Sequence, residues 1–145
     1  MDKKAIAIGV AVFTGLYIFH AVIIPLLASM SDKNILAGSL IWMAHQSLGF
    51  LTCIIAGIVA GGIAGKSGFK HGFIVGMLGT VLSALLASMM PESPISSFPL
   101  GIRVVSWLLV NGAIAGLAGL FAVSFIEKKN RKPEDESKDK GGFAA

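Results

Sequence analysis

Residues 49–88 read GFLTCIIAGIVAGGIAGKSGFKHGFIVGMLGTVLSALLAS, two apolar segments joined by a short basic turn at residues 66–71. Small residues recur at every fourth position on both sides of that turn. Positions four apart share one face of a helix, so each segment is predicted to carry a ridge without bulky side chains. In a bilayer such ridges let two backbones approach closely, and the pattern predicts a tightly packed transmembrane hairpin. The ridge residues are Gly49, Cys53, Gly57, Gly61 and Gly65 before the turn, and Gly68, Gly72, Gly76, Thr80, Ala84 and Ser88 after it.

The composition indicates a membrane protein. The chain has 145 residues, of which 54% are hydrophobic and 14% are charged, and its mean hydropathy is +0.80. Soluble domains carry about 25% charged residues. The net charge of +4 comes from lysines that flank the apolar segments, so it does not indicate nucleic-acid binding. The expected partner is the lipid bilayer, and the expected fold is a single all-α integral membrane domain.

Four apolar segments are each long enough to cross a bilayer, which takes about 20 residues. The predicted spans are 5–28, 40–65, 73–90 and 101–126, and together they make up a domain of residues 1–126. Three prolines within 91–99 predict a loop between the last two spans. Residues 127–145 hold six basic and five acidic side chains and almost nothing apolar, so a disordered cytoplasmic tail is predicted.

Basic residues predict the orientation, because lysine and arginine gather on the cytoplasmic side of a membrane. With four spans, ten basic residues fall on one side and two on the other. The prediction is a multi-pass protein of the cell membrane with both termini in the cytoplasm. The larger set is Lys3, Lys4, Lys66, Lys70, Lys128, Lys129, Arg131, Lys132, Lys138 and Lys140, and the smaller is Lys33 and Arg103.

Polar residues inside the spans are the candidate functional site. His20, His45, Gln46 and Asn111 are predicted to lie in the outer half of the bundle, with Thr14 and Ser47 at similar levels. Such groups either form interhelical hydrogen bonds or line the path of a solute or ion. A metal site needs more donors than these, so neither a metal nor another cofactor is expected.

Other functional classes find little support in the sequence. No span contains Asp or Glu, which coupled transporters use to carry a proton or cation. Residues 60–67, AGGIAGKS, approach a phosphate-binding loop, but that loop follows a strand and here a span precedes it. The glycines are better explained by helix packing and Lys66 by topology. No arrangement typical of a catalytic site is present, and the protein is not expected to be an enzyme.

The fourth span carries packing residues of its own. Residues 111–116, NGAIAG, are similar to residues 56–61, AGIVAG, which would relate the fourth span to the second as a repeat. Gly112 and Gly116 are therefore added to the predicted helix-packing residues. The cluster of Lys128, Lys129, Arg131 and Lys132 fits contact with anionic lipid and fits topology determination equally well.

Residues 56–79, AGIVAGGIAGKSGFKHGFIVGMLG, resemble small, glycine-rich, four-span prokaryotic membrane proteins of unknown function, which are frequent in archaea. The resemblance covers the second and third spans and implies the four-span fold, but no activity or site residue. The leading hypothesis is a structural, interaction or accessory subunit that packs or oligomerises through its Gly-xxx-Gly faces, as a homo-oligomer or within a larger membrane complex. The alternative is a passive channel or facilitator for a small solute that uses the polar cluster.

Overall fold

The computed structural model describes residues 1–30, 35–89 and 100–140, and the surroundings of side chains within 1–29, 39–89 and 105–130. The described residues form helices and no strand, which confirms the all-α fold. The four helices are α1 (Lys3–Met30), α2 (Ile35–Ala64), α3 (Gly68–Ser88) and α4 (Leu100–Lys140).

Each helix contains a stretch long and apolar enough to cross a membrane. These stretches are Lys3–Ser29, Ser39–Ala64, Gly68–Ser88 and Val105–Asn130. The chain is therefore a multi-pass membrane protein with four spanning helices among its described residues. The third span begins at Gly68, five residues before its predicted start, so the turn is shorter than expected. The predicted loop at 91–99 lies outside the described residues.

The turn between α2 and α3 uses two residues in the left-handed conformation. Gly65 has φ 63° and donates its N–H to the carbonyl of Gly61 at 3.1 Å, a helix C-cap that favours glycine because no Cβ opposes it. Ser67 has φ 52° and immediately precedes α3. Gly65 was predicted to pack against another helix, and this prediction is wrong: the residue is exposed and a Cβ there would meet no atom within 4 Å.

The last helix is longer than predicted. α4 does not end at residue 126 but continues to Lys140, so the prediction of a disordered tail is wrong for residues 127–140. Residues 141–145 lie outside the described part. The physical reason is that a helix already formed in the membrane extends without a new nucleation step, and Lys and Glu are good helix formers.

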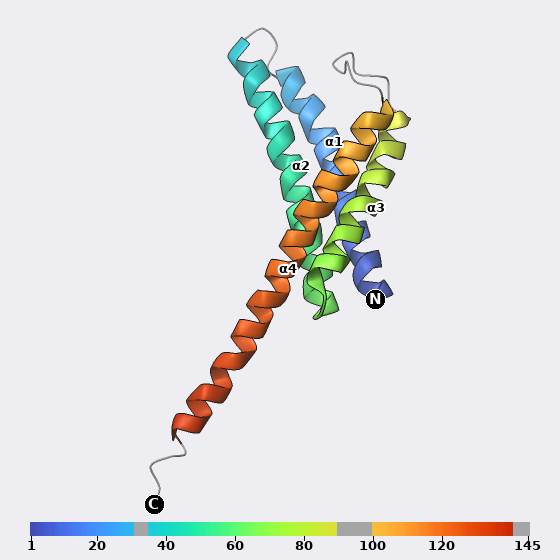
Figure 1. The fold of residues 1–145 in the computed structure, drawn as a ribbon. Helices are drawn as coiled ribbons and strands as arrows, with labels where there is room; N and C mark the ends of the chain where they lie inside the picture. The colour runs from blue at the N-terminus through green and yellow to red at the C-terminus, as the bar shows by residue number, and fades with distance from the viewer. Residues whose placement is uncertain (31–34, 90–99, 141–145) are drawn as a thin grey trace, which may run out of the picture.

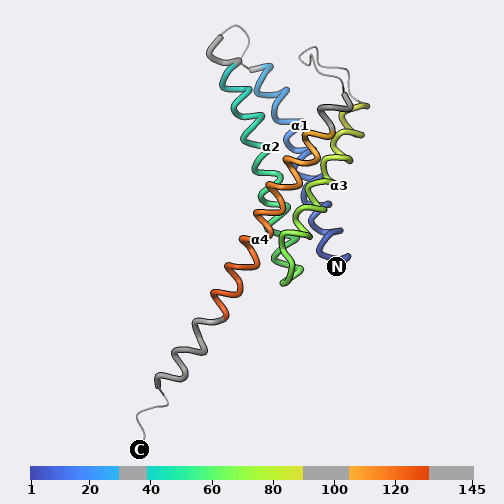
Figure 2. The backbone as a smooth tube through the Cα atoms, viewed as in Figure 1, coloured from blue at the N-terminus to red at the C-terminus, as the bar shows by residue number. Residues whose placement is uncertain are grey.

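The helices alternate in direction (Figure 1). The N terminus and the α2–α3 turn lie at one end of the bundle, here called the near end, and α4 projects past it (Figure 2). The opposite end, where α1 leads to α2 and α3 leads to α4, is called the far end. α2 and α3 each contact both α1 and α4, whereas the described parts of α1 and α4 do not contact each other. The α2–α3 hairpin therefore lies between the other two helices.

The glycine ridges of the hairpin face α4. A Cβ added to Gly57 of α2 or to Gly72 of α3 would overlap the same carbonyl, that of Ala115. One turn nearer the α2–α3 connection, a Cβ on Gly61 or on Gly68 would overlap the carbonyl of Gly119. Both ridges therefore lie against the backbone of a single helix.

The predicted pairing of the ridges is thus only partly right. The sequence predicts that spans two and three pack chiefly on each other, whereas their glycines pack on α4. Gly76 continues the α3 ridge, since a Cβ there would lie 2.5 Å from the carbonyl oxygen of Asn111. Because α4 contacts both ridges, its backbone lies close to α2 and to α3 at once. If the two ridges faced each other, only α2 and α3 would be in close contact.

The hairpin also packs on α1, again through small residues. A Cβ on Gly9 of α1 would lie 2.7 Å from the Val75 side chain, and one on Gly79 of α3 would overlap the Phe13 ring. Phe13 and Val75 belong to the buried core together with Cys53, Ala56, Ala60 and Ala115. Most of these core side chains are small, so the helices approach closely in this part of the bundle.

The far half of the bundle packs less closely. Buried positions of α2 run from Thr52 to Gly61, those of α3 from Gly68 to Thr80, and those of α4 from Gly112 to Val123. Beyond Thr80 the residues of the α3 ridge are no longer buried, and Ser88, the last predicted residue of that ridge, is exposed. The exposed side chains there are bulky, Val22, Leu26, Leu40, Trp42, Met43, Leu85, Met89, Val105 and Trp107 among them.

We expect Gly72→Leu to destabilise the bundle by at least about 1–3 kcal/mol, because the new side chain would start at the Ala115 carbonyl and force α3 away from α4. The measurement is the free energy of unfolding, from titration of the purified protein in mild detergent with a denaturing detergent. The control is Gly15→Leu, since Gly15 is exposed and no atom lies within 4 Å of its added Cβ. Equal tolerance of both changes would contradict the packing described here.

Candidate functional site

Two histidines form a hydrogen-bonded pair between α1 and α2. The Nε2 atom of His20 and the Nδ1 atom of His45 are 2.7 Å apart, and the ring centroids are 4.6 Å apart. One nitrogen must donate and the other accept, so a single proton lies between the rings. His20 is 7% exposed, whereas His45 is exposed. The pair therefore joins a buried ring to one on the outside of the bundle.

The surroundings of His20 come from small and aromatic residues. Tyr17, one turn earlier on α1, meets the His20 ring edge-on with centroids 6.3 Å apart. Gly49 of α2 lies beside the ring, because an added Cβ would be 4.0 Å from Cε1 of His20. Gly49, predicted as a helix-packing residue, therefore lies against a side chain rather than against a backbone. The absence of a side chain at Gly49 leaves room for the imidazole.

Asn111 belongs to a second polar contact, between α3 and α4. Its Nδ2 donates to the hydroxyl of Thr80 at 3.0 Å, and that hydroxyl donates to the carbonyl of Gly76 at 2.7 Å. Thr80 is 1% exposed. The predicted polar cluster therefore consists of two separate contacts in the structure, one on each side of the hairpin, and Asn111 bonds to neither histidine. Sequence position indicates depth in the membrane, but not which way each side chain faces around its helix.

Gln46 joins neither contact. It is exposed on α2, and its side chain makes no hydrogen bond within the part of the chain that the structure describes. Ser47 is exposed as well. The hydroxyl of Thr14 on α1 is buried and finds no partner among the described residues. These three residues were predicted near the histidine level, and only the two histidines pair there.

The third histidine takes part in a contact that the sequence did not predict. His71, which is 4% exposed, accepts the backbone N–H of Asp2 at Nε2, 2.9 Å away. Its Nδ1 lies 3.0 Å from the carbonyl oxygen of Ser67 and must donate to it, which fixes a neutral ring with the proton on Nδ1. The Asp2 carboxylate accepts the N–H groups of Lys4 and Ala5 and so caps α1. The N terminus of the chain is thereby joined to α3.

The remaining predicted packing residues lie in the interior. Cys53 is buried as a free thiol in the core cluster. Gly112 faces the side chains of Phe73 and Met77, and Gly116 faces that of Phe69. Sequence reasoning missed Gly9, Gly79 and Gly119. Gly119 follows Ala115 by four residues on α4, and Gly9 follows Ala5 by four on α1, so the same spacing rule applied to those helices would have found both.

Among the described residues, no group of three His, Cys, Asp or Glu side chains is placed to hold a metal ion. The two imidazoles share one proton in a hydrogen bond, and this bond joins α1 to α2.

Comparison of the chain with protein-family models, with curated proteins and with solved structures finds no match.

We expect His20→Ala and His45→Ala to be coupled in a double-mutant cycle by about 0.5–2 kcal/mol, because each removes the same hydrogen bond. The measurement is again the free energy of unfolding in detergent. In the matched cycle of His20→Ala with Asn111→Ala, the effects should add within about 0.5 kcal/mol, since the two contacts share no partner. Strong coupling between His20 and Asn111 would mean that a single polar cluster exists after all.

Proposed function

We propose that the protein is an interaction subunit of a membrane complex, which binds a transmembrane helix of another polypeptide chain through one face of α2. This face consists of two apolar residues, Met43 and Phe50, and two polar residues, Gln46 and Ser47. All four residues are exposed, with Met43 57% and Phe50 49% accessible. Their spacing of three and four residues puts them on one side of the helix. They lie in the far half, where the bundle packs least closely.

The single observation that carries the proposal is the exposed amide of Gln46 inside a membrane span. The span of α2 begins at Ser39 and has 26 residues, or about 39 Å at 1.5 Å per residue. This length exceeds the hydrocarbon thickness of about 30 Å, and Gln46 is about 10 Å from the span's end. An amide without a partner in hydrocarbon costs several kcal/mol. A hydrogen-bonding side chain from a neighbouring helix would remove that cost.

The glycine ridges are less suitable as the association surface. The sequence-based hypothesis assigns oligomerisation to Gly-xxx-Gly faces, but Gly57, Gly61, Gly68 and Gly72 are buried against α4 within one chain. A second chain cannot use these faces unless α4 leaves them. This internal use of the ridges supports a location on the outer surface of α2 instead.

A passive channel, the alternative hypothesis, has weaker support. The polar residues of such a channel belong to two separate contacts. The His20–His45 pair joins α1 to α2, whereas the Asn111–Thr80 contact joins α3 to α4. Toward the near end, the buried side chains of the core cluster are small or apolar. A solute path would need polar side chains through that region, and the buried hydroxyls of Thr52 and Thr80 already donate to carbonyls of their own helices, those of Leu48 and Gly76.

We further propose that the near end faces the cytoplasm of the cell. The basic residues at this end include Lys3, Lys4, Lys66 and Lys70, which follows the rule for cytoplasmic segments. Accessibility of a tag at either terminus to externally added protease, in intact cells, would contradict this orientation.

We expect Gln46→Leu to weaken association about three- to thirtyfold, the loss of one interhelical hydrogen bond worth about 0.6–2 kcal/mol. The measurement is photo-cross-linking in native membranes from a benzoylphenylalanine placed at Phe50, which replaces one exposed aromatic ring by another. The adduct's mass distinguishes a second copy of the chain from a different subunit, and either result supports an interaction subunit.

Two matched variants control this experiment. Gln46→Asn keeps an amide and should preserve much of the cross-linking. Ser124→Ala removes an exposed hydroxyl on α4 that donates to its own helix at Leu120, 3.0 Å away, and should have no effect. The proposal fails if Phe50 yields no protein adduct, or if Gln46→Leu cross-links as well as the wild type.

A further inference from the structure

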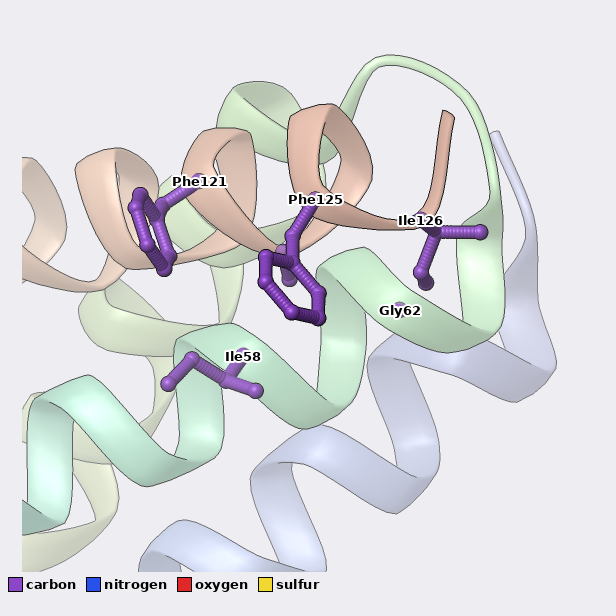
Figure 3. Close-up of a pocket in the computed structure, with 6 residues that line it drawn as sticks. Ile58, Gly62, Phe121, Phe125 and Ile126 are labelled. Atoms are coloured by element: carbon purple, nitrogen blue, oxygen red, sulfur yellow. The ribbon is translucent and has the colours of Figure 1, made fainter. Parts of the chain in front are cut away.

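A narrow apolar groove runs between α2 and α4 on the outside of the bundle (Figure 3). Its volume is about 200 Å³, and its lining residues are Ile58, Gly62, Phe121, Ala122, Phe125 and Ile126. Gly62 leaves the α2 side open, because a Cβ there would meet only the end of the Ile126 side chain, at 3.8 Å. Phe121 and Phe125 are 67% and 65% exposed, so this groove faces the surrounding membrane.

The chemistry of the groove suits a hydrocarbon chain. The stacked rings of Phe121 and Phe125, with centroids 6.4 Å apart, form one wall along about one turn of α4. The lining holds no charged side chain. A single acyl chain lying parallel to the two helices would contact only apolar side chains and Gly62 there.

Lysines follow the groove residues at the near end of both α2 and α4. Each residue of an α-helix advances about 100° around the axis, so Lys129 falls within about 10° of the average direction of the four α4 residues that line the groove. Glu127 falls about 170° away by the same spacing, on the opposite side of the helix. On the other wall, Lys66 comes two residues after the end of α2. Lys66 and Lys129 are both exposed.

We propose that this groove binds an anionic phospholipid from the leaflet at the near end. One acyl chain lies between α2 and α4, and the phosphate headgroup lies at the mouth beside Lys66 and Lys129. Each lysine near the membrane surface contributes about a fivefold preference for an anionic over a neutral lipid. The neutral part of the site, the groove itself, accepts either kind of lipid. This inference is independent of the interaction proposed for α2 in the far half.

Native mass spectrometry of the full chain in mild detergent tests the headgroup contact, by titration with phosphatidylglycerol or with phosphatidylcholine of the same acyl chains. We expect the wild type to bind phosphatidylglycerol at least tenfold more tightly. Lys66→Gln and Lys129→Gln should each weaken phosphatidylglycerol binding about fivefold and leave phosphatidylcholine binding unchanged. The control is Lys3→Gln, because Lys3 is an exposed near-end lysine on α1, which does not contact the described part of α4.

A second variant tests the groove separately from the charges. Gly62→Leu places a side chain in the groove and should reduce the binding of both lipids several-fold, whereas Gly15→Leu, on the open surface of α1, should change neither. Equal affinity of the wild type for the two lipids would overturn the proposal, as would unchanged phosphatidylglycerol binding by both lysine variants. Unchanged binding by Gly62→Leu would overturn the placement of the acyl chain.

Discussion

The close approach of α4 to the α2–α3 hairpin is the contact on which the rest of the fold depends. In hydrocarbon the hydrophobic effect does not drive helices together, so association relies on dispersion and on polar contacts. Both weaken steeply with distance, which makes the lack of a Cβ at Gly57 and Gly72 decisive: the two glycines meet at the same carbonyl of Ala115. The hairpin thereby holds a third helix at two successive levels, through Ala115 and through Gly119.

The spacing of the glycines explains why the two levels coincide. Gly61 and Gly68 are nearly equidistant from the turn at Gly65, and so are Gly57 and Gly72, so antiparallel helices bring each pair to the same depth. The four-residue spacing of the small residues allowed the ridges and the hairpin to be predicted, and the lengths of the apolar segments allowed the four spans to be predicted. The partner of the ridges could not be predicted, because a smooth face shows that a backbone approaches without showing which one. The same limit applies to Asn111, whose depth was predictable and whose partner, Thr80, was not.

The two halves of the bundle differ because the small residues are unevenly distributed. In the near half, glycine and alanine let the four helices pack through their backbones. In the far half, bulky residues such as Trp42 and Leu85 are exposed on the outside of the bundle, and the buried His20 of α1 contacts α2 through a hydrogen bond instead. A directional bond between side chains holds two helices across a wider gap than dispersion can. The His20–His45 pair is therefore best understood as the far-half counterpart of the glycine contacts.

This difference also separates the two surfaces that are available to other molecules. The near half is already held together by the α4 contacts and by the link from Asp2 to His71, so its outer groove can accept a flexible lipid chain without any change in helix packing. The far half has fewer internal contacts, and its exposed amide at Gln46 lacks a partner among the described residues. A neighbouring helix with a hydrogen-bonding group would stabilise the far half by a polar contact, as the glycine contacts stabilise the near half. The two proposed binding surfaces, one for lipid and one for a protein partner, thus lie in opposite halves of the same four helices.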